Sequence, residues 1–325
     1  MDTIRSVVTG TGHYLPENIV PNSYFEEYID TSDEWITART GIKRRHYAPT
    51  EETTSTMGIK AARKALKNSG CKPEDIDLII LATSTSDHTF PSTATQIQNG
   101  LGITRGYAFD LQAVCAGFVF ALANANALIK SGEATKALVI GSETFSRILD
   151  KNDRTTCILF GDGAGAVVLE GAKTTNGGSD RGILATDLHS DGSFKDILYV
   201  DGGVSTTKTS GHLRMKGKEV FRHAVSKLVN STERVMEKAN VTSAEVDWAV
   251  PHQANVRIIQ STTQKLKIPI EKVVVTLQNH GNTSAASIPI SLSVANEEGK
   301  FKKGDLILSH AIGGGLCWGS FLLRW

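Results

Sequence analysis

The chain repeats itself, and this repeat constrains the fold more than any single motif does. Residues 61–80 and 232–250 both read as a helix, a short polar turn, an acidic step and an apolar strand. The two strands begin 170 positions apart, at Asp77 and Asp247. Later apolar runs of the two halves match in the same order, which indicates two copies of one α/β unit.

The predicted halves are residues 1–171 and 172–325, and the polar stretch 171–180 is expected to join them. Helices are predicted at Glu51–Ser69 and Gly117–Ser131, because each run ends at a glycine. Short apolar runs predict strands at Leu78–Ala82, Ala137–Ile140, Ala164–Leu169, Val273–Leu277 and Leu306–Ser309. The fold class is therefore α/β, with strands covered on both faces.

The composition excludes several classes of protein. Of 325 residues, 40% are hydrophobic and 21% are charged, as in an ordinary globular protein, and the net charge of +1 gives no general attraction to nucleic acid. We expect no membrane-spanning run and no signal peptide, so the expected location is the cytoplasm. The four cysteines lack the spacing of a metal site, and no metal is expected.

Cys115 lies where a strand-like run ends and a helix begins. At the first turn of a helix the peptide dipole favours thiolate, so we expect a lowered pKa for this thiol. Leu111-Gln112 before Cys115 echoes Leu277-Gln278 before Asn282, at an offset of 166, which predicts equivalent turns for the two residues. His252 follows the strand that begins at Asp247, so one crevice is expected to hold all three side chains.

Several segments, taken in order, resemble the β-ketoacyl-acyl-carrier-protein synthase III family, the condensing enzymes that start bacterial fatty-acid synthesis. The segments are Thr31–Ile36, Arg39–Ile42, Phe90–Ala94, Asp110–Phe118, Phe160–Ala166, His252–Asn255, His280–Ala285 and Gly313–Gly315. The resemblance covers nearly the whole chain. It implies the thiolase fold, in which two pseudo-symmetric halves form a five-layered αβαβα arrangement.

The resemblance also implies a reaction in two steps. Cys115 would take an acyl primer from acyl-CoA as a thioester. His252 and Asn282 would stabilise the enolate formed when malonyl-acyl-carrier protein loses CO₂. The backbone N–H groups of Cys115 and Gly314 would form a second oxyanion hole, and His280 would support the turn that carries Asn282. The products would be a 3-oxoacyl-acyl-carrier protein, CoA and CO₂.

Binding roles follow from the same resemblance. Trp35 and Arg154 would sandwich the adenine of CoA, Arg39 would contact a phosphate and Asn255 the pantetheine arm. Exposed basic side chains would contact the acidic acyl-carrier protein, namely Arg222, Arg257 and Lys265. The acyl pocket and the interface of a homodimer would involve Phe90, Phe160 and Ile312. Acyl-CoA would be a substrate, and no tightly bound cofactor is expected.

Two alternatives stay open at this point. The chain could be a secondary-metabolite condensing enzyme of polyketide or alkylquinolone type on the same scaffold. It could also be a non-catalytic partner subunit, although such a subunit would be expected to lose Cys115 or His252, and both are present. Ile312 stands where many relatives carry phenylalanine, and the preferred primer is left undetermined.

Overall fold

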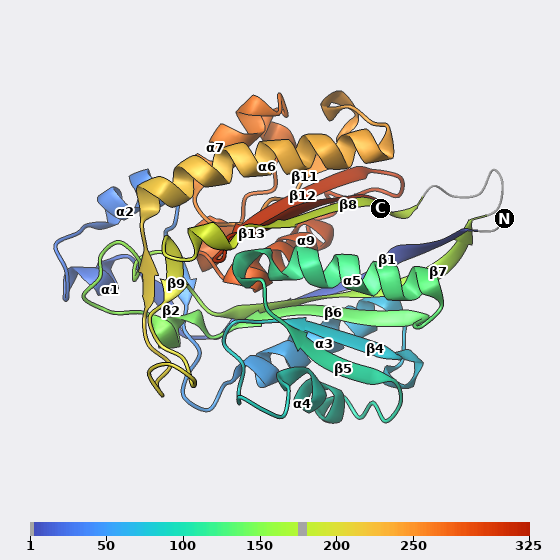
Figure 1. The fold of residues 1–325 in the computed structure, drawn as a ribbon, viewed down its shortest axis with the longest axis horizontal. Helices are drawn as coiled ribbons and strands as arrows, with labels where there is room; N and C mark the ends of the chain where they lie inside the picture. The colour runs from blue at the N-terminus through green and yellow to red at the C-terminus, as the bar shows by residue number, and fades with distance from the viewer. Residues whose placement is uncertain (1–2, 175–180) are drawn as a thin grey trace.

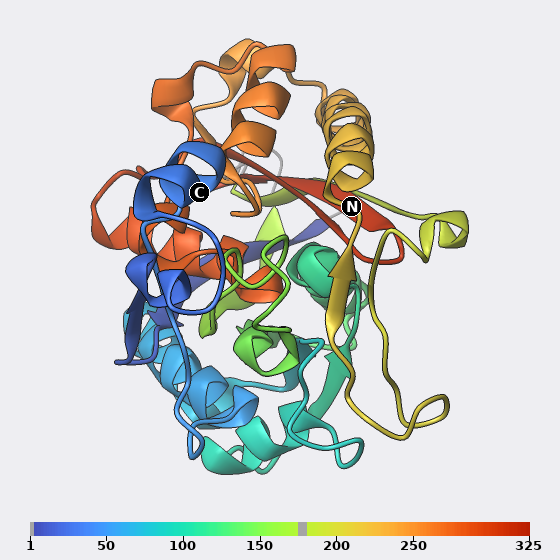
Figure 2. The same ribbon diagram turned by 90° about the vertical axis from the view of Figure 1, so that its left-hand side faces the viewer.

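The computed structural model describes residues 3–174 and 181–325, and its helices and sheets stack in five layers. The two views in Figures 1 and 2 agree that α5 and α9 lie between two sheets, and that further helices cover the outer faces. Central helices α5 (Gly117–Ser131) and α9 (Ser287–Glu297) follow the 3₁₀ turns η2 (Val114–Ala116) and η7 (Ser284–Ala286). The five-layered αβαβα arrangement is confirmed.

The first sheet has the strand order β1-β7-β6-β4-β5. Its strands are β1 (Thr3–Tyr14), β4 (Leu78–Ala82), β5 (Tyr107–Leu111), β6 (Lys136–Glu143) and β7 (Gly163–Thr174). Its outer face is covered by α3 (Thr54–Ser69) and α4 (Thr93–Gly100). The predicted linker overlaps the end of β7, and its residues 175–180 lie outside the described residues.

The second sheet has the order β11-β12-β13-β8. Its strands are β8 (Gly182–Ser190), β11 (Trp248–Ala249), β12 (Leu306–Gly313) and β13 (Cys317–Arg324), covered by α6 (Gly217–Ala239) and α7 (Val256–Lys265). Smaller elements lie at the end of the layers that carries the site. The helices are α1 (Ser23–Glu26), α2 (Asp33–Thr40) and α8 (Leu277–His280). Two short strand pairs join β2 (Ile19–Pro21) to β3 (Arg44–His46) and β9 (Leu198–Val200) to β10 (Leu213–Met215).

The repeat is confirmed at an offset of 170 from the end of the outer helix to the central strand. Outer helices α3 and α6 end at Gly70 and Asn240, and both residues have the left-handed backbone conformation that ends helices. Central strands β6 and β12 begin 170 positions apart, and so do helices α5 and α9. This offset aligns Cys115 with Ala285, and Asn282 with Gln112. The predicted equivalence of Cys115 and Asn282 was therefore wrong by three residues, because the Leu-Gln echo is not a structural match.

A second prediction that was wrong is the strand at Val273–Leu277. Val273 makes only an isolated bridge to Ala249, and Leu277 begins α8. The buried Gln253 side chain accepts hydrogen bonds from the backbone N–H groups of Thr276 and Leu277, at 2.8 and 3.2 Å. A side chain therefore satisfies donors that a neighbouring strand would otherwise pair.

The expectation that no run is long and apolar enough to span a membrane was wrong, because the window Val114–Ser131 has that length and composition. In the fold, the α5 part of this window lies between the two sheets (Figures 1 and 2). Its side chains share one apolar cluster with Val139 of the first sheet and Ile307 of the second. A core position, covered on both sides by strands, explains its apolar composition.

Gly141 on β6 provides a test of how the halves meet. A Cβ there would lie 2.3 Å from the carbonyl oxygen of Ala285 in η7, so Gly141→Ala forces the two halves apart. We expect it to lower the free energy of unfolding by about 2–3 kcal/mol, measured by urea denaturation. Gly192→Ala is the control, because a Cβ there meets nothing within 4 Å. Equal stability of the two variants would contradict this view of the interface.

Candidate active site

At the candidate site, the central strand of each half packs against a turn of the other half. The end of β12 packs on η2 of the first half, and the end of β6 packs on η7 of the second. Glycine makes both approaches possible, since a Cβ at Gly313 would lie 2.6 Å from the backbone nitrogen of Cys115. Val114 and Ser284, at equivalent positions of the two turns, both have a φ of +49°. The turns thereby bring the thiol of one half beside the Asn282 amide of the other.

Cys115 lies in η2, directly before α5, and its side chain is buried. Burial raises the pKa of the thiol to about 12, and nearby Glu143 acts in the same direction, while Ser284 acts to lower it. The expected lowering of the pKa by the helix dipole was wrong as a net effect, because desolvation of the thiolate is larger. The resting residue is a neutral thiol.

His252 is buried, and its orientation is fixed by Ser287, the first residue of α9. The Ser287 hydroxyl lies 2.6 Å from Nδ1 of His252, and it also accepts a hydrogen bond from the backbone N–H of Gln253. Burial lowers the pKa of His252 to about 3, so the ring is neutral at neutral pH. The Ser287 hydroxyl can accept from Gln253 and donate its own hydrogen to Nδ1, and in that arrangement Nε2–H is the free donor of the ring.

Asn282 is held in a similar way. Its side-chain oxygen accepts a hydrogen bond from the backbone N–H of Ser284 at 2.9 Å, so its amide N–H₂ is left to face the pocket. Its backbone is bridged to Phe160 of the other half. His280 hydrogen-bonds the carbonyl of Gly281, next to Asn282, and burial lowers its pKa to about 4.

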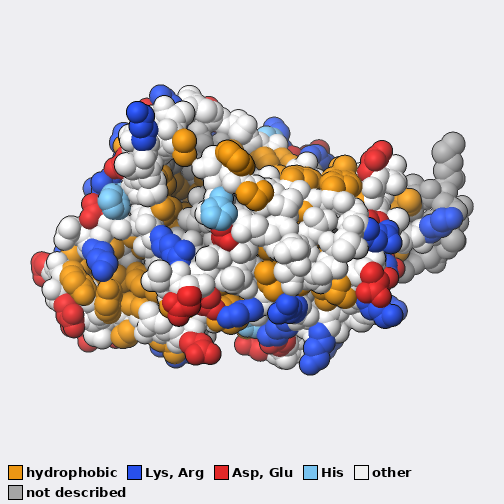
Figure 3. Space-filling model, turned by 90° about the horizontal axis from the view of Figure 1, so that it is seen from below, with side chains coloured by type: hydrophobic (Ala, Val, Ile, Leu, Met, Phe, Trp, Pro, Cys, Tyr) orange, Lys and Arg blue, Asp and Glu red, His pale blue; other side chains and the backbone are white. Residues whose placement is uncertain are grey.

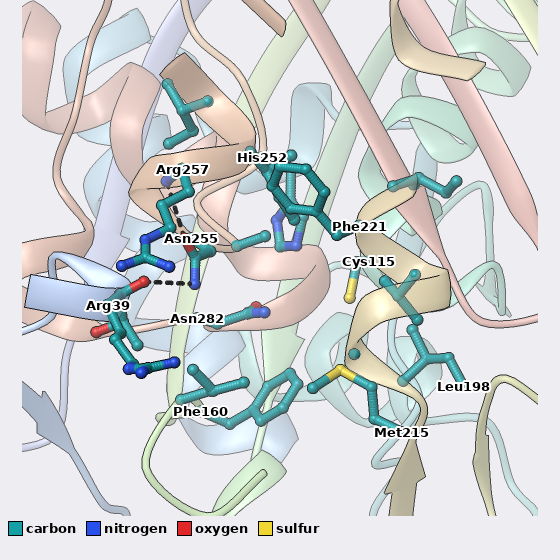
Figure 4. A pocket seen from close by; sticks show the side chains of 18 of the residues that line it. Arg39, Cys115, Phe160, Leu198, Met215, Phe221, His252, Asn255, Arg257 and Asn282 are labelled. Atoms are coloured by element: carbon teal, nitrogen blue, oxygen red, sulfur yellow. Dashed lines mark hydrogen bonds between the residues drawn. The ribbon is translucent and has the colours of Figure 1, made fainter. Parts of the chain in front are cut away.

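The side chains of Cys115, His252 and Asn282 line a cavity of about 340 Å³. Figure 4 shows Cys115, His252 and Asn282 converging on it from three segments that are far apart in the sequence. The predicted residues that also line this cavity are Trp35, Arg39, Arg154, Asn255, Arg257, Phe160 and Ile312. Gly314 lines a neighbouring cavity instead, and Arg222, Lys265 and Phe90 line neither.

The predicted adenine sandwich is closed in this structure. The guanidinium groups of Arg154 and Arg39 lie over the Trp35 ring, at 5.0 and 4.7 Å from its centroid. A base between two stacking partners needs about 7 Å, which is two contact distances of about 3.5 Å. One of the two arginines must therefore move before a base can stack against Trp35.

Asn255 is already engaged by the protein. Its side chain caps α7 by accepting from the backbone N–H of Arg257 at 2.8 Å, and it donates to the carbonyl of Arg39 at 3.2 Å (Figure 4). It thus joins α7 to α2 at the pocket wall. One amide hydrogen is left for a ligand.

Two buried residues next to this chemistry had not been identified from the sequence. Glu143 accepts hydrogen bonds from Thr83, Ser84 and Thr85, and burial raises its pKa to about 7. His310 lines the cavity that contains Cys115, and burial lowers its pKa to about 4. Each follows an apolar run and one serine, Ser142 or Ser309, so a pair of polar residues is the only signal in the sequence.

The surface has no general charge bias on the face seen in Figure 3, where Lys and Arg are mixed with Asp and Glu. Among the described residues, no group of three or more His, Cys, Asp or Glu side chains could hold a metal ion. Any recognition of an acidic partner must therefore depend on local side chains.

Comparison with known proteins gives a consistent result. Family models described as 3-oxoacyl-(acyl-carrier-protein) synthase III and its C-terminal part match residues 109–192 and 236–325. The β-ketoacyl-(acyl-carrier-protein) synthase III of Cereibacter sphaeroides is 62% identical over 323 residues, which cover 99% of this chain and 100% of the relative. The crystal structure of 3-oxoacyl-(acyl-carrier-protein) synthase III from Aquifex aeolicus superposes with a TM-score of 0.93 at 50% identity, covering 98% and 100% of the two chains. The priming β-ketosynthase of the R1128 polyketide pathway superposes at 0.92 with 35% identity, covering 99% and 96%.

The raised pKa of Cys115 can be tested by alkylation with iodoacetamide. Since only the thiolate reacts, the rate at Cys115 should rise about tenfold per pH unit between pH 7 and 9 without a plateau. Peptide mass spectrometry identifies the modified cysteine, and Cys115→Ser gives the background of the other three thiols. A plateau near pH 7 would instead show a thiolate stabilised by the helix.

Proposed function

Since the chain belongs to the 3-oxoacyl-(acyl-carrier-protein) synthase III family, we propose how its pocket divides the family's reaction between its residues. The chain is an acyltransferase of the condensing type, and its reaction is the initiating condensation of fatty-acid synthesis. The observation that carries the division of roles is the pair of fixed N–H donors, from His252 and Asn282, beside the buried thiol of Cys115.

In the first step, the Cys115 sulfur attacks the carbonyl carbon of acyl-CoA, and CoA leaves. The thioester oxygen becomes negatively charged on the way, and the backbone N–H groups of Cys115 and Gly314 are proposed to stabilise it. The acyl chain then occupies the apolar side of the cavity, between Phe160 and Ile312, both of which are buried there.

In the second step, malonyl-acyl-carrier protein loses CO₂ and leaves an enolate, which attacks the acyl-cysteine. Nε2–H of the neutral His252 and the amide of Asn282 donate to the enolate oxygen as its charge develops. The donors cost no reorganisation at that moment, because Ser287 and the backbone of Ser284 already hold them in place.

A polyketide priming role is less supported. Relatives named β-ketoacyl-(acyl-carrier-protein) synthase III reach 62% identity over 99% of the chain, against 35% for the priming enzyme of a polyketide pathway. A non-catalytic subunit is also disfavoured, since the thiol and both donors are present and oriented toward one cavity.

We further propose that the protein is a homodimer in which Phe90 enters the partner subunit. The supporting observation is that this phenylalanine is 83% exposed, which is costly for an aromatic side chain in water. Sedimentation velocity of wild type and Phe90→Asp would test it, and a wild type that sediments as a monomer would contradict it.

Separate measurement of the two steps tests the assignment of the three residues. Intact mass after mixing with acetyl-CoA should show an acyl adduct on wild type and none on Cys115→Ala. His252→Ala and Asn282→Ala should still acquire the adduct but lose condensation with malonyl-acyl-carrier protein by about 10²–10³-fold. Ser287→Ala should act in the same direction more weakly. An adduct on Cys115→Ala, or loss of acylation alone in the other two variants, would contradict the proposal.

The proposed contact with the acyl-carrier protein can be tested by reversing one charge at the cavity wall. Arg257 is exposed at the cavity wall, while Arg222 and Lys265 are exposed on α6 and α7. Arg257→Glu should raise the KM for malonyl-acyl-carrier protein several-fold at low salt and leave kcat unchanged, because it acts on encounter. Lys302→Glu, near the opposite end of β12, is the control. Equal effects of the two substitutions would remove the carrier role.

A further inference from the structure

A row of polar side chains crosses three neighbouring strands of the second sheet. His310 on β12 is paired in register with Ser320 on β13, which is paired with Asp187 on β8. Ser231 and Thr232 of α6 complete the row, and all five residues are buried. The steps are 3.1 Å from His310 Nδ1 to Thr232, 3.4 Å from Thr232 to Ser320, 3.0 Å from Ser320 to Ser231 and 3.0 Å from Ser231 to Asp187.

The two ends of this row reach different places. His310 lines the cavity that contains Cys115, and in the described part of the chain its Nε2 has no hydrogen-bond partner. At the other end, Asp187 lies 2.6 Å from Nε2 of His189, whose side chain is 26% exposed, and 2.7 Å from Nζ of the half-exposed Lys238. The row therefore connects the pocket with solvent through the protein interior.

The carboxylate fixes the direction of every hydrogen bond in the row. Hydrogen bonds from Lys238, His189 and Ser231 outweigh burial and hold the pKa of Asp187 below its usual value, so the group only accepts. Ser231 then donates to Asp187, and it must accept from Ser320, which in turn accepts from Thr232. Thr232 accepts from Nδ1–H of His310. The lone pair of His310 Nε2 is thus left on the pocket side.

The other half of the molecule shows that the fold does not require this row. At the offset of 170, the residues equivalent to His310, Ser231 and Thr232 are Ile140, Ala61 and Ala62. Strand pairing continues the equivalent row through Ala166 to Gly12. None of these five residues has a polar side chain. Only the copy whose row ends at the pocket has a continuous hydrogen-bonded path.

This inference rests on the proposed function. In that reaction a path for protons is needed, because the resting Cys115 is a neutral thiol. Acylation breaks the Sγ–H bond while the Sγ–C bond forms, and condensation returns Cys115 as a thiolate that must regain a proton. During both steps a pantetheine arm occupies the cavity mouth. Burial of an unneutralised charge there would be costly.

We propose that the row from His310 to Asp187 and His189 is a proton relay. On acylation, the Cys115 proton crosses the cavity that both residues line to His310 Nε2, and Nδ1–H passes to Thr232. One proton then emerges at Asp187, which releases it to the solvent beside His189 and Lys238. CoA leaves as thiolate and is protonated by water. On condensation, the acyl–Sγ bond breaks, Sγ takes the proton back from His310, and the row shifts in reverse. Each turnover therefore takes up one solvent proton, which CoA carries away.

The test replaces relay residues by those of the other half, which the fold already accommodates. Ser320→Ala and Ser231→Ala should each slow single-turnover acylation and condensation by about tenfold or more while leaving the KM for acyl-CoA unchanged. The double variant should be no slower than either single variant, because one break interrupts a series path, whereas independent structural losses would add. The rates can also be measured in mixtures of H₂O and D₂O. Their dependence on the deuterium fraction should show that several protons move in the rate-limiting step of wild type, and fewer in the variants.

Thr263→Ala is the matched control, since Thr263 is a buried hydroxyl that bonds only within α7. It should leave both steps unchanged. Wild-type rates in Ser320→Ala, or additive losses in the double variant, would overturn the relay. Failure of the proposed function would look different, because wild type itself would then acquire no acyl adduct on Cys115.

Discussion

The site depends on the crossed packing of two turns, in which each half of the molecule presses its central strand against the turn of the other half. Gly141 and Gly313 allow this contact, because a side chain at either position would overlap the backbone of η7 or η2. Contacts this close leave little freedom for the two turns. The thiol on one turn and the amide beside the other are consequently held together by the packing of the whole fold.

Burial produces the chemistry of the pocket as well as its shape. It keeps Cys115 as a thiol and the histidines neutral, because the free energy lost when a charge leaves water exceeds the free energy gained from the surrounding dipoles. Neutral groups can act as directed hydrogen-bond donors only if something else fixes their orientation. Ser287 and the backbone of Ser284 do this for His252 and Asn282.

The two copies of the repeated unit have kept their backbone and diverged in their interior. One copy has apolar residues between its sheet and outer helix, whereas the other has hydroxyl groups, a histidine and a carboxylate at the same positions. Buried polar groups are tolerated when each finds a partner, and this row satisfies its members in sequence. The divergence lies in the copy that also carries His252 and Asn282, which links it to the site.

The sequence by itself determined the repeat, the α/β class and many of the elements. Strand β4 and helix α5 occur at the predicted residues, because a short continuous apolar run and a terminal glycine are local signals. It also identified Cys115, His252 and Asn282 as candidates that line one cavity. Tertiary structure decided the pairing of Cys115 with Ala285, the loss of the strand at Val273 and the direction of the thiol pKa shift. Each of these depends on contacts between segments that are separate in the sequence or on the exclusion of water, which only the assembled fold establishes.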